Sequence, residues 1–299
     1  MSMRICDNSP LSTSKVAVCP YCGVTGRFDF QFYQRTYFQC PSCHLIYLVR
    51  TSKEQENILS YYSEDYFRNC ANDQTERDRM HLYSHILDVI ERYQKKGHLL
   101  DVGCGCGFFL REAKKRGWKV FGIDPSKESV AIAHEMVGND VAVGTLRDLN
   151  TMDLFDAITM INVIDHIIDP WTDISRSMKL LRSGGLLYLR FPNGYFHRCI
   201  IKTRMKLTQK PILNQLLVFH EYVFTPAFIK LHLFEQGFHL IKIQNARLSG
   251  AALYHHSPIS MILGGVLNSF IWMAISFLQY ISGSRCLLGP SLEVTAFKK

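Results

Sequence analysis

A glycine loop between two acids holds the residues with the clearest chemical potential. Gly103, Gly105 and Gly107 follow Asp101 at the end of a short apolar run, and Asp124 ends the next such run. Glycines let the backbone approach a ligand without a side-chain clash, and a helix that starts after the loop presents free N–H groups. Asp101 can hold an ammonium group, and Asp124 can accept both hydroxyls of a ribose. The pattern predicts a cradle for a nucleoside-containing cofactor.

The glycine spacing separates two classes of cofactor. Dinucleotide-binding loops read G-x-G-x-x-G, whereas here Phe108 directly follows Gly105-Cys106-Gly107. The carboxylate of Asp101 would also repel a pyrophosphate. The loop therefore disfavours an NAD(P)-dependent oxidoreductase, which stays as the alternative function, and favours a cationic cofactor.

Two cysteine pairs lie near the N-terminus, Cys19-Pro20-Tyr21-Cys22 and Cys40-Pro41-Ser42-Cys43, with 17 residues between them. Four thiolates at this spacing can close a tetrahedral Zn²⁺ site without an open position, so we expect a structural metal. A pair of redox dithiols is the competing interpretation. A zinc ribbon can also bind nucleic acid or a protein while the rest of the chain serves as scaffold. We do not expect nucleic acid as a partner.

From residue 98 onward, short apolar runs alternate with helical patterns. We expect strands at 99–102, 119–123, 140–143, 157–161, 186–191, 238–244 and 292–297, and helices at 108–116, 126–137, 171–181 and 225–236. Ser126 is a suitable N-cap for the second helix. This alternation predicts an α/β fold, a parallel sheet with helices on both faces.

Four motifs together resemble those of class I S-adenosylmethionine-dependent methyltransferases. They are 99–107 (motif I), 121–126 (the second motif), 155–158 with 163–170 (the fourth-strand signature) and 180–185 (the turn before strand five). Ubiquinone O-methyltransferases and sugar C-methyltransferases are the most similar members. The resemblance implies a Rossmann-like, seven-stranded sheet preceded by a zinc ribbon, with S-adenosyl-L-methionine as cofactor. The expected reaction is methyl transfer to an oxygen or carbon of a small acceptor that can be anionic, sugar-linked or lipid-linked.

The resemblance also assigns roles to residues of the cofactor site. Asp101 and the three glycines would hold the methionine part and Asp124 the ribose. Thr145 and Leu146 would border the adenine, and Asn162 would line the methyl-donor site.

Catalytic candidates follow the fourth expected strand of the sheet. Asp165 and His166 lie where ligands bind in this architecture, and His220 precedes a later helix. An alcohol or carbon acid must lose a proton, so His166 or His220 is the expected base, although either can simply pack in the fold. Asn162-x-x-Asp165-His166 with His220 also resembles the metal cluster of small-RNA 2′-O-methyltransferases. There Asn162 replaces a glutamate ligand, which argues against metal-assisted catalysis.

The net charge of +8 belongs to the C-terminal half. Between residues 174 and 292 there are 13 Lys and Arg but only two acids, Glu221 and Glu235. A basic, irregular insert at 195–219 carries Arg198 and Lys202 among others, which suits a phosphorylated or nucleotide-sugar acceptor. The same charge also fits a merely solvated face.

An uncharged stretch follows, and its apolar core at 259–281 is long enough to be a membrane candidate. Because the last strand must return to the sheet, the topology argues against a single crossing. We expect a helix in a membrane interface, against a partner, or buried in the fold.

Four parts make up the expected organisation. They are a disordered tail at 1–15, a zinc ribbon at 16–50, a helical linker at 51–97 and a methyltransferase domain at 98–299. No apolar signal region is visible near the N-terminus. We therefore expect a cytoplasmic protein, with peripheral contact at the inner face of a membrane as an option.

Overall fold

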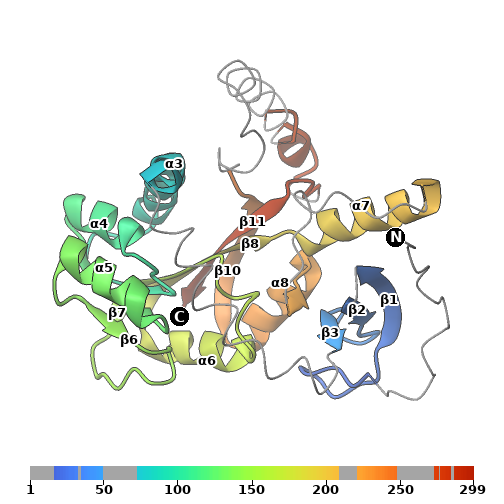
Figure 1. The fold of residues 1–299 in the computed structure, drawn as a ribbon, viewed down its shortest axis with the longest axis horizontal. Coiled ribbons are helices and arrows are strands. Elements are labelled where there is room, and N and C mark those ends of the chain that lie inside the picture. Colours follow the sequence, from blue (N-terminus) through green and yellow to red (C-terminus); the bar gives the residue numbers. More distant parts are fainter. Residues whose placement is uncertain are drawn as a thin grey trace, which may run out of the picture.

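The computed structural model describes residues 17–32, 35–49, 73–208, 221–247, 273–275, 277–283 and 286–299. At its centre lies a seven-stranded sheet in the order β10-β11-β8-β7-β4-β5-β6 (Figure 1). Its strands are β4 (His98–Val102), β5 (Lys119–Asp124), β6 (Val141–Val143), β7 (Phe155–Ile161), β8 (Leu181–Pro192), β10 (Phe238–Asn245) and β11 (Ser291–Lys298). Neighbours from β6 to β8 pair in parallel, and β11 pairs antiparallel to both β8 and β10. The predicted α/β sheet is confirmed.

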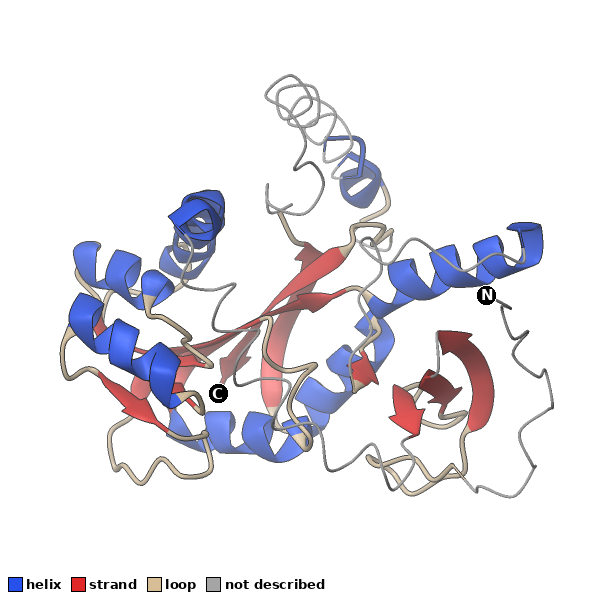
Figure 2. Ribbon diagram, in the orientation of Figure 1, coloured by secondary structure: helices blue, strands red, loops and turns tan. Residues whose placement is uncertain are grey.

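Helices cover both faces of this sheet (Figure 2). They are α3 (Asp73–Glu91), α4 (Phe108–Lys115), α5 (Lys127–Val137), α6 (Pro170–Leu180) and α8 (Pro226–Glu235). Alternate residues of each strand enter different cores, as the two-residue period of a strand requires. Leu100 and Leu187 pack with residues of α6 and α8, whereas Leu99 and Leu186 pack with residues of α3, α4 and α5.

Helix starts are set by local caps. The side chain of Ser126 accepts a hydrogen bond from the N–H of Ser129 at 3.1 Å, so the predicted N-cap of α5 is confirmed. Thr225 caps α8 in the same way, and Pro226 takes the first helical position, where its missing N–H costs nothing.

One predicted element is wrong. The stretch that follows β8 was expected to be irregular, but α7 occupies Gly194–Thr208. Asn193 starts it, because its Oδ1 accepts hydrogen bonds from the N–H groups of Tyr195 and Phe196 at 3.1 and 3.4 Å. The many basic residues of the stretch obscured a helical pattern. The remainder of the insert, 209–219, lies outside the described residues.

A smaller, four-stranded antiparallel sheet lies beside the main body. Its order is β1-β2-β3-β9, formed by β1 (Arg27–Phe32), β2 (Arg35–Gln39), β3 (Ile46–Val49) and β9 (Tyr222–Val223). The first three strands belong to the region expected as a zinc ribbon. The fourth comes from the middle of the methyltransferase domain, which was not predicted.

Candidate active site

The glycine loop lies where β4 ends and α4 begins, at the carboxyl edge of the sheet. Gly103, Gly105 and Gly107 have φ angles of 71°, 51° and 80°, a region that disfavours residues with a Cβ. A Cβ at Gly103 would lie 2.5 Å from Val163, and one at Gly107 2.9 Å from Ala133. A Cβ at Gly105 would meet nothing within 4 Å. The outer two glycines are therefore needed for packing, whereas Gly105 borders space that a ligand can enter.

Both predicted acids lie at this loop, and both are buried. Asp101 is 3% exposed and accepts a hydrogen bond from the hydroxyl of Thr159 at 2.6 Å. Burial raises the pKa of Asp101 to about 7, and the negative charge of Asp124 acts in the same direction. The carboxylate of Asp124 accepts hydrogen bonds from the N–H groups of Gly105 and Ser126 at 2.8 and 2.9 Å. Two buried carboxyl groups beneath an open glycine loop fit a ligand that carries positive charge.

Three further residues predicted for the cofactor site lie at the same edge. Thr145 and Leu146 follow the short β6, whose last pairing joins Val143 to Asp124. Both the N–H and the hydroxyl of Thr145 donate to Asp148, at 2.8 and 2.7 Å, and Leu146 is fully buried. Asn162 directly follows β7 and has a φ of 56°. The fold thus brings the loop, both acids and these three residues to one edge.

Arg190 on β8 also belongs to this site, although its place there was not predicted from the sequence. Its guanidinium donates to Oδ1 of Asn162 at 2.5 Å, and the N–H of Asn162 donates to the carbonyl of Arg190 at 2.8 Å. Arg190 is only 5% exposed, and burial lowers the pKa of its side chain. Glu293 of β11 pairs with Arg190 in register and accepts a hydrogen bond from Tyr188 at 2.9 Å. The charge of Arg190 within the otherwise apolar run 186–191 is the sequence feature that could have indicated this cluster.

The catalytic candidates Asp165 and His166 lie in the loop after β7. Asp165 is 2% exposed, and burial raises its pKa to about 7 while the charge of Arg190 opposes that shift. Nε2 of His166 lies 3.8 Å from Oδ2 of Asp165, and the His166 side chain is 27% exposed. Burial lowers the pKa of His166 to about 4, so its imidazole is neutral at pH 7. His220 lies outside the described residues.

Comparison with known proteins decides the family. A family model described as a methyltransferase domain matches residues 75–243, more than half of the chain. The chain is a class I S-adenosylmethionine-dependent methyltransferase. The alternative of an NAD(P)-dependent oxidoreductase is therefore wrong. Binding of nucleic acid or protein by the cysteine-containing module stays a prediction.

Curated relatives of the methyltransferase match only in part. The ubiquinone biosynthesis O-methyltransferase of Nitrobacter winogradskyi is 30% identical over 94 residues, which are 30% of this chain and 36% of the relative. The same enzyme of Alkalilimnicola ehrlichii is 32% identical over 95 residues, covering 29% of this chain and 38% of the relative. The chain thus spans little more than a third of the length of these relatives.

Solved structures support the fold of the methyltransferase. Magnesium protoporphyrin IX methyltransferase from Synechocystis PCC 6803, with bound S-adenosylhomocysteine, gives a TM-score of 0.52 at 15% identity. That match covers 82% of this chain and 100% of the other. Phosphoethanolamine N-methyltransferase 2 of Haemonchus contortus gives a TM-score of 0.50 at 17% identity, covering 81% of this chain and 60% of the other.

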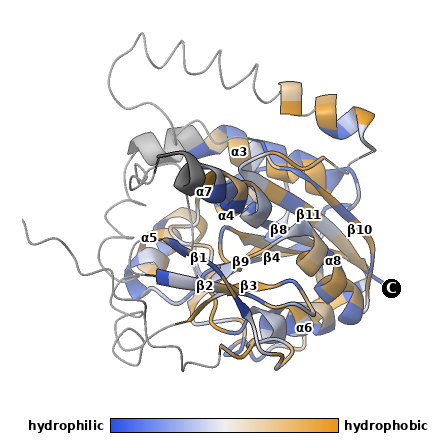
Figure 3. Ribbon diagram, turned by 90° about the vertical axis from the view of Figure 1, so that its right-hand side faces the viewer, coloured by the Kyte–Doolittle hydropathy of each residue, from blue (hydrophilic) through white to orange (hydrophobic). Residues whose placement is uncertain are grey.

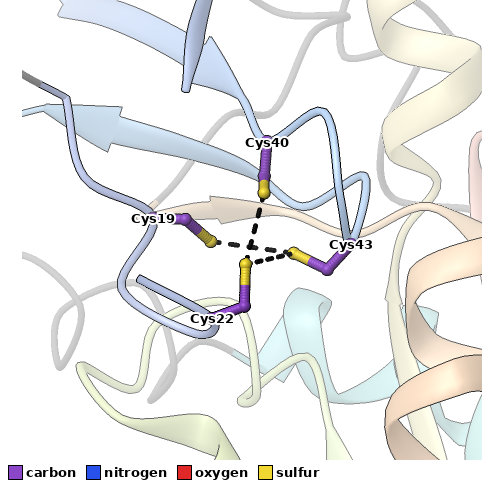
Figure 4. A group of neighbouring side chains, drawn as sticks. All are labelled: Cys19, Cys22, Cys40 and Cys43. Atoms are coloured by element: carbon purple, nitrogen blue, oxygen red, sulfur yellow. Dashed lines mark hydrogen bonds between the residues drawn. The ribbon is translucent and has the colours of Figure 1, made fainter. Parts of the chain in front are cut away.

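The methyltransferase also contains the predicted cluster of four cysteines (Figure 4). The Sγ atoms of Cys19, Cys22, Cys40 and Cys43 all lie within 4.8 Å of one another, and three pairs are 3.4 to 3.7 Å apart. Tetrahedral zinc–thiolate bonds of about 2.3 Å place sulfur atoms about 3.8 Å apart, so the cluster fits Zn²⁺. His44, whose φ is 62°, is exposed beside the cluster, as expected for a surface residue rather than a ligand.

The basic insert corrects one further expectation for the methyltransferase. Arg198 and Lys202 of α7 were expected to suit an anionic acceptor. Instead, Nε and Nη2 of Arg198 each donate to the carboxylate of Asp29 at 2.6 Å, and Lys202 binds the same carboxylate. Asp29 belongs to β1. The charges of Arg198 and Lys202 therefore hold the cysteine-containing module against α7.

Proposed function

We propose that the enzyme transfers the methyl group to an oxygen or carbon of a small acceptor that lies over the carboxyl ends of β7 and β8. The observation that carries this proposal is the Asp165–His166 pair, which follows Asn162 in the loop after β7. Val163 of the same loop lies beside Gly103 of the glycine loop. The partly exposed His166 is the member that an acceptor can touch, because Asp165 is buried behind it.

S-adenosyl-L-methionine supplies an activated methyl group, so the protein mainly has to position the two reactants and remove a proton. The open glycine loop would hold the methionine and ribose parts, with Asp101 facing the ammonium group and Asp124 the ribose hydroxyls. Thr145 and Leu146 would border the adenine. Asn162, held by Arg190, would line the side from which the methyl group leaves.

Proton removal is assigned to the neutral imidazole of His166. Its Nε2 faces Asp165, so we assign proton uptake from the acceptor to Nδ1. An ionised Asp165 would stabilise the resulting imidazolium, as carboxylates do for catalytic histidines in general. Since the pKa of Asp165 is raised to about 7, this assistance develops around neutral pH.

Two features support an acceptor that is anionic, sugar-linked or lipid-linked. Arg190 supplies a positive charge beside Asn162, and curated relatives are named for O-methylation in ubiquinone biosynthesis. The four cysteines would bind one structural Zn²⁺, since four thiolates leave no open position for catalysis.

Peripheral membrane contact is proposed for the end of the apolar segment. Most of 259–281 lies outside the described residues, but Phe277, Tyr280 and Ile281 are 63%, 83% and 59% exposed. Residues 273–275 and 277–281 are helical, and Figure 3 shows them outside the sheet layers and largely in the hydrophobic colour. None of the helices in the described part of the chain has the length and apolar character needed to cross a bilayer. Flotation with anionic liposomes should be lost when 259–281 is deleted, and unchanged flotation would refute the contact.

The transferase proposal is tested in two steps. Isothermal titration should detect S-adenosylhomocysteine binding to the native enzyme. Phenols, quinols, nucleotide sugars and phosphorylated sugars are then screened by release of S-adenosylhomocysteine from the donor. With the acceptor so found, His166→Ala should lower kcat by about 100-fold while donor affinity stays unchanged. A native rate in His166→Ala would refute the assigned base.

A further inference from the structure

The four-cysteine module (residues 17–49) shares its sheet with the methyltransferase domain. β3 pairs with β9 through Ile46 with Val223 and Tyr47 with Tyr222, and the N–H of Leu48 donates to the carbonyl of Glu221 at 3.0 Å. Figure 3 shows β9 beside β3. Main-chain hydrogen bonds between strands fix position more firmly than side-chain contacts alone, because each backbone group needs a partner. Any displacement of β3 must therefore move β9.

The module also holds α7. Asp29 has a side chain only 3% exposed, and it binds both Arg198 and Lys202. Burial opposes ionisation of this carboxyl, yet the hydrogen bonds from these two cations lower its pKa. Such a paired, buried carboxylate is costly to separate from its partners. Because α7 begins at Gly194, two residues after β8 ends at Pro192, the module is tied to the end of β8.

A third contact links the module to the start of α6. Tyr21 lies between the first two cysteines, and its ring centroid is 5.3 Å from that of Trp171. Trp171 in turn lies 5.0 Å from the ring of Tyr222. Aromatic pairs in these tilted arrangements contribute beyond simple burial. Trp171 lies at the start of α6, just after the loop that carries Asp165 and His166. The module therefore approaches that loop at its C-terminal end.

Tyr222 makes the direct connection to this loop. Its hydroxyl donates to the carbonyl of Ile168 at 2.5 Å, two residues after His166. The backbone of Tyr222 is held by Tyr47 of β3, and its ring is held by Trp171. Tyr222 thus stands between the module on one side and the catalytic loop on the other.

Different contacts hold the donor side, that is, the proposed S-adenosylmethionine site. The N–H groups of Gly103 and Cys104 donate to the carbonyl of Ile123, and that of Gly105 donates to Asp124. Asn162 is held by Arg190 rather than by the module. A disturbance of the module should therefore reach residues 163–169 and leave the donor site intact.

We propose that Tyr222 is a positioning residue through which the four-cysteine module fixes the Asp165–His166 loop on the acceptor side. This inference rests on the proposed role of Asp165 and His166. A metal at the four cysteines would act through the same route, because Cys40 directly follows β2 and Cys43 lies three residues before β3. Metal in the module and order in the catalytic loop are then coupled, while donor affinity is independent of both.

The test is Tyr222→Phe, which removes the hydroxyl bonded to Ile168 and keeps the ring. Tyr47→Phe is the matched control, because Tyr47 lies opposite Tyr222 and its hydroxyl donates at 2.7 Å to Ala17 within the module. Amide hydrogen exchange of residues 163–169 is measured in both variants, in the native enzyme and in enzyme stripped of metal by a chelator. Titration with S-adenosylhomocysteine reports donor affinity in each sample.

We expect exchange at 163–169 to be about three- to tenfold faster in Tyr222→Phe and in the metal-stripped enzyme, the range for loss of one hydrogen bond. It should be unchanged in Tyr47→Phe, and donor affinity should stay within about twofold throughout. With an acceptor from the screen, Tyr222→Phe should lower kcat/KM for the acceptor and leave KM for the donor unchanged.

Native exchange at 163–169 in Tyr222→Phe would overturn the proposal. Equal acceleration in Tyr47→Phe, or a weakened donor affinity, would also overturn it, since either indicates general loosening. Failure of the proposed function is distinguishable, because it would appear as no binding of S-adenosylhomocysteine by the native enzyme or as a native rate in His166→Ala. The loop exchange can be measured in either case.

Discussion

Binding of S-adenosylhomocysteine should release a proton from Asp101. The carboxyl group is 3% exposed and has a pKa raised to about 7, so a large fraction of it is protonated near neutral pH. An ammonium group within about 4–6 Å lowers a carboxyl pKa by about 1–3 units. If the pKa falls from about 7 to about 5, then binding at pH 6.5 releases about 0.7 proton, and binding at pH 8.5 releases almost none.

The sign of the pH dependence follows from the same shift. The ligand prefers the ionised carboxylate, so affinity should rise with pH from about 5 to about 7 and stay constant above that. A shift of two pKa units corresponds to an affinity about 100-fold higher at pH 8 than below pH 5. A buried carboxyl group that faces no cation of the ligand would give no such rise in affinity with pH.

Calorimetry in buffers with different ionisation enthalpies counts the protons directly. The matched control is Asp101→Asn, which is nearly isosteric and retains an oxygen to accept the hydrogen bond from Thr159. This variant should lack the proton that Asp101 releases, and its affinity should change much less than that of the native enzyme between pH 5 and 8. Any proton released by Asp124, whose pKa burial also raises, would persist in the variant and can be subtracted.

Two results would refute this reasoning. Equal proton release by the native enzyme and by Asp101→Asn would mean that another group titrates. A flat affinity between pH 5 and 7 in the native enzyme would mean that Asp101 does not face the ammonium group, and the assignment of the methionine part to this end of the loop would be wrong.

Three other outcomes follow from the site. A side chain would lie at a φ of 51° in Gly105→Ala and of 75° in Gly184→Ala, with nothing within 4 Å of either Cβ. Both variants should therefore lower the free energy of unfolding by about 1 kcal/mol, measured by thermal unfolding. Only Gly105→Ala should also weaken S-adenosylhomocysteine binding. In Asp165→Asn the initial rate should be about tenfold or more lower and lose its rise with pH around 7, because that rise reports ionisation of a carboxyl whose pKa is raised to about 7. Cys22→Ser should reduce bound zinc from about one ion per chain to a small fraction, measured by mass spectrometry, and native zinc content would refute the four-thiolate site.

The main sheet could be predicted from the sequence because its signals are local. The strands from 98 to 124 are apolar runs that end in carboxylates, and helices begin at residues that can cap them. Ser126 and Thr225 each accept a hydrogen bond from an N–H three residues later, as their residue types suggest. The glycine loop is equally readable, because positive φ angles require glycine at Gly103 and Gly107, where a Cβ would also collide with neighbours.

Other features depend on contacts between residues far apart in the chain. β9 consists of only two residues, Tyr222 and Val223. They form a strand because they pair with the edge of β3, which lies more than 170 residues earlier in the chain. A two-residue run has no period from which a strand can be inferred. Arg190 could not be predicted for a related reason: its role depends on Asn162, in the loop after β7, and on Glu293 of β11.

The charge of α7 illustrates most clearly what composition cannot predict. The C-terminal half has an excess of Lys and Arg, which favours an anionic acceptor. Yet Arg198 and Lys202 are both bound to Asp29, so their charge is matched by an acid from the N-terminal module. A count of charges along the chain cannot detect such a match, because it ignores which segments meet in the fold. The proposal of an anionic acceptor therefore rests on Arg190, which is buried beside Asn162. The basic helix instead explains why the module remains attached to the enzyme.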